Sequence, residues 1–264
     1  MQKRSSIFWG LVLIILAAVL LLIQLDLVKG SAWWDIFWPL VLILVGIWML
    51  IGYFLRHKIG PEEQVSLDLG NARSAYIKIN HGAGQLILHG GAPAGKLLSG
   101  SCHGGLDLHS EISGEKLDVK LHTPSQFWDW APGAGLDWNL AFSNEVPLKI
   151  KIESGASASS FDFTDLLLTD LKVETGASST EIKMPVRAGN TMADIDTGVS
   201  SLKLIVPEGV SARIRIKGGL SAINVNTTRF PLVEGKVYQS SDYTTAVNRL
   251  DLTVDAGVGA IDIV

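Results

Sequence analysis

Residues 171–183 read LKVETGASSTEIK, and residues 193–204 read ADIDTGVSSLKL. In each stretch apolar residues alternate with polar ones, a glycine and several small residues follow, and the alternation resumes. Alternation with a period of two indicates a strand with one buried face. A glycine among small residues is typical of a tight corner that needs a positive φ or a close backbone approach. Each stretch therefore predicts two strands joined at a glycine corner.

The same unit recurs along much of the chain. Further copies occupy residues 76–88, 148–160, 212–225 and 250–264, and the glycines at 155, 176, 198 and 219 are 21, 22 and 21 residues apart. One such strand–Gly–strand unit cannot bury its apolar face alone, so stacked copies predict an all-β domain of the β-solenoid class. The alternative is a β-sandwich of short strands joined by turns. The near-constant spacing favours the solenoid.

The beginning of the chain is of a different kind. Residues 7–23 and 36–55 are apolar runs without a charged side chain. At about 1.5 Å per helical residue they reach roughly 26 and 30 Å, close to the hydrocarbon thickness of a bilayer. They predict an N-terminal transmembrane α-helical hairpin over residues 1–58, with spans at about 7–25 and 36–55. A cleaved signal peptide is the alternative for the first run, although no small-residue cleavage site follows it.

Charges beside the spans predict which side the β domain faces. Lys3 and Arg4 precede the first span, and Arg56 and Lys58 follow the second. Because positive residues near membrane ends stay in the cytoplasm, we expect a cytoplasmic β domain. An inverted hairpin with the domain outside is the alternative. The residues expected to anchor the hairpin at the membrane surface are Trp33, Trp34, Trp38, Arg56 and Lys58.

After the hairpin we expect a short polar linker at residues 59–66 and the β-solenoid domain at 67–264. Two excursions, residues 122–144 and 227–248, interrupt its repeat. The first excursion contains the candidate partner-binding residues Trp128, Trp130 and Trp138. We expect both excursions to cap the solenoid and cover an exposed strand edge, with a partner- or ligand-binding surface as the alternative.

Charge and motifs restrict the function. The chain has 22 Lys and Arg against 26 Asp and Glu, and the part after residue 58 has a net charge of about −7 with no basic stripe, which argues against nucleic-acid binding. The stretch 81–122 contains five histidines, but neither they nor the single Cys102 form a tight metal-ligand pair. Nucleophile-elbow and phosphate-loop motifs are also missing. We therefore expect no catalytic residue, metal site or cofactor.

Taken together, the hairpin and the β domain resemble the LiaF-like membrane protein family, and the β module resembles the toastrack fold. The residues that carry the resemblance are Trp33-Trp34, the segment 37–40, the basic exit 56–58, and the corner segments 174–179, 196–201 and 256–262. The resemblance implies a non-enzymatic regulator of bacterial cell-envelope stress signalling, anchored in the inner membrane by several passes. It also implies a membrane sensor kinase as partner, besides the lipid bilayer itself.

A second hypothesis comes from the solenoid alone. Its ends offer unpaired strand edges, which can stack into homo-oligomers or filaments. A self-assembling membrane scaffold is therefore the alternative function.

Overall fold

A computed structural model of the protein describes residues 62–124 and 136–264. All regular elements in these two ranges are strands: β1 (Glu63–Asp68), β2 (Ser74–Gly90), β3 (Lys96–Cys102), β4 (Asp107–Ser113), β5 (Lys116–His122), β6 (Trp138–Phe142), β7 (Leu148–Asp162), β8 (Leu168–Lys183), β9 (Asn190–Ile205), β10 (Ser211–Val225), β11 (Leu232–Glu234), β12 (Val237–Gln239) and β13 (Arg249–Ile263). Within the described ranges, no helix has the length and apolar character to cross a membrane. The spans expected at 7–25 and 36–55 and the five anchoring residues lie outside those ranges.

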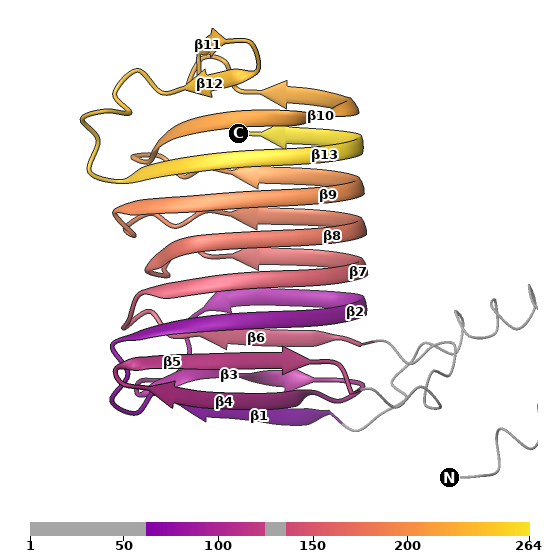
Figure 1. Ribbon diagram of the computed structural model, residues 1–264, viewed down its shortest axis with the longest axis vertical. Helices are drawn as coiled ribbons and strands as arrows, with labels where there is room; N and C mark the ends of the chain where they lie inside the picture. Colours follow the sequence, from indigo (N-terminus) through magenta and orange to yellow (C-terminus); the bar gives the residue numbers. More distant parts are fainter. Residues whose placement is uncertain (1–61, 125–135) are drawn as a thin grey trace, which may run out of the picture. The chain divides into compact units, whose positions relative to one another are not determined.

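Six long strands, one for each repeat seen in the sequence, form a stack. In Figure 1 each of them runs along one face, turns at a common corner and returns along the other face. Neighbouring long strands are parallel and paired residue for residue on both sides of the corner, as in β8 and β9. The all-β fold is thus confirmed, and the stack is solenoid-like. Each repeat is one continuous bent strand, however, and not the two strands that the sequence suggested.

The core lies between the two faces of the stack. In β9, Ala193, Ile195 and Thr197 are buried before the corner, and Ser200, Leu202 and Leu204 are buried after it. The buried set therefore changes from odd to even positions across Gly198 and Val199, which both face solvent. Two successive outward residues are what allow a strand to turn while keeping its apolar side inward.

The corner glycines pack directly on one another. A Cβ on Gly155, Gly176, Gly198 or Gly257 would lie 2.7, 3.0, 2.7 or 2.7 Å from the carbonyl oxygen of the glycine in the preceding rung of the stack. Real Cβ atoms essentially never come within 2.7 Å of a heavy atom from a distant part of the chain, and 3.0 Å is tighter than nine in ten of their contacts. These glycines are required by close approach of the backbones, since none of the four has a positive φ.

The order of the strands in space differs from their order in the chain. The rungs follow one another as β2, β7, β8, β9, β13 and β10, so β13 lies between β9 and β10. Beyond β10, the second excursion contributes β11 and β12, and its Phe230 and Tyr243 are buried. Beyond β2, the stack is completed on one face by β5 and β4, and on the other by β6, β3 and β1.

One expected boundary is wrong. The residues assigned to a linker at 59–66 include Glu63–Ser66, which belong to β1. They form a strand because β1 pairs antiparallel with β3, which in turn pairs with β6. Their polar sequence is explained by position, since β1 is the last strand of its face.

The glycine contacts make a direct prediction. Gly198→Ala should lower the free energy of unfolding by about 1–3 kcal/mol, because the added methyl group overpacks the corner. The neighbouring outward residue provides the control: Val199→Ala should change stability by less than about 0.5 kcal/mol. Chemical denaturation followed by circular dichroism measures both. Equal effects of the two substitutions would contradict the packing argument.

Candidate functional site: the corner groove

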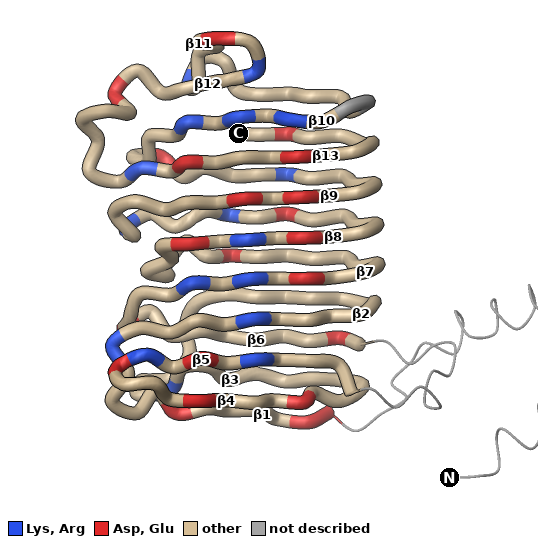
Figure 2. Tube along the Cα trace, viewed as in Figure 1, with Lys and Arg blue, Asp and Glu red and all other residues tan. Residues whose placement is uncertain are grey.

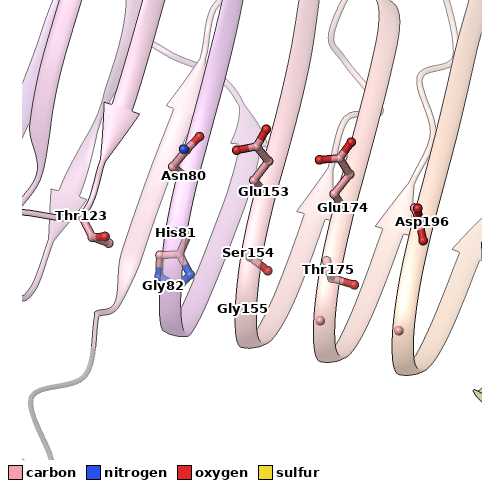
Figure 3. A pocket seen from close by; sticks show the side chains of 12 residues that line it. Asn80, His81, Gly82, Thr123, Glu153, Ser154, Gly155, Glu174, Thr175 and Asp196 are labelled. Atoms are coloured by element: carbon pink, nitrogen blue, oxygen red, sulfur yellow. The ribbon is translucent and has the colours of Figure 1, made fainter. Parts of the chain in front are cut away.

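A shallow groove follows the corner of the stack across several rungs, and we call it the corner groove (Figure 3). Its floor is the backbone at the corner glycines, which have no side chains to fill it. Along one wall stands a column of polar outward side chains, each two residues before its glycine: Asn80, Glu153, Glu174 and Asp196. Beyond the glycines come the small outward residues Ala83, Ala156, Ala177 and Val199.

At one end of the groove the carboxylates are paired with lysines. Lys78 lies 2.9 Å and Lys151 2.6 Å from Glu153, while Lys151 and Lys172 lie 3.4 and 2.8 Å from Glu174. The hydrogen bond from Lys151 lowers the pKa of Glu153, and the one from Lys172 lowers the pKa of Glu174. These pairs are partly exposed, so each contributes at most about 1 kcal/mol.

Towards the other end the carboxylates have no such partners. Asp196 of β9 faces Asp255 of β13 in the pairing of these strands, and Asp194 lies two residues before Asp196. In the part of the chain that the structure describes, none of these three aspartates forms an ion pair. Figure 2 shows acidic residues on the neighbouring strands β8, β9 and β13, with a basic residue, Lys172, between two of those on β8. Asp194 faces Lys172 of β8 and Asp255 faces Lys217 of β10 without forming an ion pair, whereas Asp196 lies between Glu174 and Asp255. Negative charge is therefore concentrated around Asp196.

Beneath the groove, hydroxyl groups pair inside the corners. Ser154 bonds Ser157 at 2.9 Å, Thr175 bonds Ser178 at 3.0 Å, and Ser200 donates to Thr197 at 2.9 Å. Each pair satisfies polar atoms that the turn would otherwise leave unbonded inside the stack, which would be costly. The hydroxyl groups of these three pairs thus have a structural role in the corners.

His81 occupies the equivalent corner position of β2. Its Nε2 lies 2.8 Å from the carbonyl oxygen of Leu136, and its ring meets the edge of Trp138 at 5.1 Å. Because a carbonyl only accepts, Nε2 carries the proton and Nδ1 is left as an acceptor. His81 is 3 % exposed, and Nδ1 has no partner among the described residues. Burial lowers the pKa of His81, against smaller raising effects from the Leu136 bond and from Asp137.

The tryptophans of the first excursion divide into two groups. Trp138 is 1 % exposed, lies in β6 opposite Leu86 of β2, and donates from Nε1 to the carbonyl oxygen of Gly105 at 3.2 Å. Its expected part in a partner-binding surface is therefore corrected: it is a core residue, because an inward position of a paired strand buries it. Trp128 and Trp130 lie outside the described residues.

Cys102 and the histidines show no clustering of the kind that holds a metal. Among residues 62–124 and 136–264, no group of three or more His, Cys, Asp or Glu side chains has such an arrangement. Burial, assisted by the nearby Glu63, raises the pKa of the Cys102 thiol to about 11. The thiol is therefore protonated at neutral pH and a poor nucleophile.

The groove itself was missed by sequence reasoning, although a signal for it exists. An acidic residue stands two positions before the corner glycine in four repeats, at Glu153, Glu174, Asp196 and Asp255. In a strand, positions with the same offset from an aligned glycine fall in one column. Aligning the repeats on their glycines would have placed these carboxylates side by side.

Comparison with known proteins identifies two regions of the chain. Residues 56–205 match the family described as the N-terminal domain of toast_rack, DUF2154, and residues 7–50 match the LiaI-LiaF-like transmembrane region. No curated protein matches the chain. A solved structure of a "putative cell adhesion protein" from Clostridium sporogenes ATCC 15579 has a TM-score of 0.71 at 21 % identity, over 78 % of this chain and 99 % of its own. That likeness concerns the fold.

The buried histidine predicts a pH dependence. The folded protein holds the pKa of His81 below its ordinary value, so below about pH 6.5 the unfolded chain binds a proton that the folded chain does not. Stability should therefore fall as the pH is lowered through this range, by up to about 1.4 kcal/mol per pH unit.

His81→Gln, whose amide can still donate to Leu136, should reduce this loss in unfolding measurements between pH 7.5 and 5.5. His109→Gln, at an exposed position of β4, is the matched control and should leave the loss unchanged. Identical pH profiles for wild type and His81→Gln would refute the assignment.

Proposed function

This chain belongs to the toast_rack family and matches a LiaI-LiaF-like transmembrane region, and on that basis we propose that it is a non-enzymatic, membrane-associated regulator of bacterial envelope-stress signalling. The observation that carries the proposal is the combination of the two matches in one chain. A membrane region and a stacked β body are joined with few residues between them, since β1 begins at Glu63.

The β body supports a role in binding. One pair of hydroxyl groups is engaged in each of the corners of β7, β8 and β9, as in Thr197 and Ser200, and the thiol of Cys102 is buried. A stack with residue-for-residue pairing presents a long and regular surface with fixed spacing between its side chains. Such surfaces are used for recognition of extended partners.

We further assign a membrane sensor kinase as the partner and the cytoplasm as the location of the β domain. The first follows from the LiaF-like resemblance. The second follows from the basic residues that flank the apolar runs, with a two-span hairpin bringing both ends of the membrane region to the inner face.

Deletion of the gene should therefore change the output of an envelope-stress response. A transcriptional reporter of that response, measured with and without a cell-wall inhibitor, should shift on deletion and return to its original behaviour on complementation with the full chain. Complementation with residues 1–61 alone should not restore it, because the β body would be missing. An unchanged reporter in the deletion strain would exclude the regulatory role.

Self-assembly is a second candidate, and one observation favours it. On one side β10 pairs with β13 from Ser211 to Val225, whereas on the other side β12 pairs only with Arg213–Arg215. The remainder of this edge has no paired strand among the described residues. Exposed edges of this kind are templates for pairing with another chain.

Light scattering on the full chain in neutral detergent tests self-assembly. The molar mass should rise with protein concentration if copies pair through β10. Ala222→Lys, at an exposed position of the open edge, should suppress the increase, because a charged side chain on an edge strand opposes pairing with another chain. A constant monomer mass would remove this candidate and leave the regulator.

A further inference from the structure

We propose that the corner groove binds a basic, extended segment of a partner protein, with Lys or Arg side chains lying at Asp196 and at the neighbouring Asp194 and Asp255, which form no ion pair among the described residues. The inference deepens the proposed function, from which it takes only the premise of a protein partner. The surface and the chemistry of its occupant come from the groove.

The polar atoms left unsatisfied in the groove are hydrogen-bond acceptors. At the β2 end, Nδ1 of the buried His81 and Oδ1 of Asn80 have no partner among the described residues, and both side chains line the groove. An acceptor without a donor at a buried position is costly. Both atoms are covered in the structure, so a ligand with N–H groups would satisfy them once the side chains of Asn80 and His81 turn towards the groove. Lysine and arginine side chains are donors only.

The charges point to the same ligand. The column of Glu153, Glu174, Asp196 and Asp255 places one carboxylate on each of four successive rungs. Adjacent strands are about 4.8 Å apart, so the carboxylates extend over roughly 14 Å. Lysines already neutralise Glu153 and Glu174, whereas Asp194, Asp196 and Asp255 have no ion pair within the described residues. A cationic segment would supply the missing partners there.

The shape of the groove favours an extended backbone. Its floor lacks side chains at Gly155, Gly176 and Gly198, so another main chain can approach closely. Beyond the floor, Val199 and Val258 lie opposite each other on β9 and β13 and are 62 % and 49 % exposed. In a segment where basic residues alternate with small apolar ones, the basic side chains can point towards the carboxylates and the apolar side chains towards these valines.

Fluorescence anisotropy with a labelled alternating lysine–alanine decapeptide tests the proposal on the full chain in neutral detergent. We expect saturable binding that weakens at least tenfold in the triple variant Asp194→Asn, Asp196→Asn and Asp255→Asn, which removes the carboxylates without ion pairs. The matched control removes three exposed acids elsewhere, Asp107→Asn, Glu111→Gln and Glu234→Gln, and should change affinity less than twofold. Equal losses in the two triple variants would mean that net charge alone attracts the peptide, and would overturn the assignment.

A second variant leaves every charge in place. Ala177→Phe adds a ring at an exposed position beside the groove floor and should also weaken binding at least tenfold, with circular dichroism confirming an unchanged fold. Full affinity in folded Ala177→Phe would overturn the proposal. These measurements use purified protein, so a failure here is separate from a failure of the reporter experiment, which tests regulation in the cell.

Discussion

The close approach of backbones at the corner glycines is the constraint on which the rest of the stack depends. Each of these glycines packs its Cα against the carbonyl of the glycine in the preceding rung, at a distance that excludes a side chain. A slip of one residue would bring a side chain into this contact and would turn the apolar residues of the strand outward. The contact therefore fixes the register of both faces at once, and the ion pairs and hydroxyl pairs follow from that register.

The same contact links stability to binding. Because the corner excludes side chains, its outer surface is a groove with a backbone floor, and the residues two positions before each glycine form a column along it. Inside the corner, hydroxyl pairs such as Thr175 and Ser178 occupy the space that the turn leaves. The rung formed by β2 departs from this arrangement, since His81 replaces the hydroxyl and bonds Leu136. His81 therefore lies at the β2 end of the groove and is also the residue through which pH should affect stability.

Sequence periodicity was enough to predict the all-β stack, because glycine spacing and apolar alternation are local signals of the repeat. It could not predict the position of β13, since parallel neighbours such as Leu252 and Ala193 are distant in the chain and any repeat can pair with any other. Trp138 was misjudged for a related reason: its burial depends on β6 pairing with β2, a contact between distant segments. The groove was missed because each acidic residue, taken alone, looks like an ordinary surface charge.

The insertion of β13 between β9 and β10 determines how the domain can be assembled during synthesis. The ribosome produces β10 and the strands β11 and β12 before it produces β13, the strand that separates β10 from β9. The native neighbour of β10 therefore does not exist when β10 emerges, and β9 presents an open edge for the same interval. Closure of the stack must wait for the arrival of residues 249–263, which makes maturation of this end of the domain a late and concerted event.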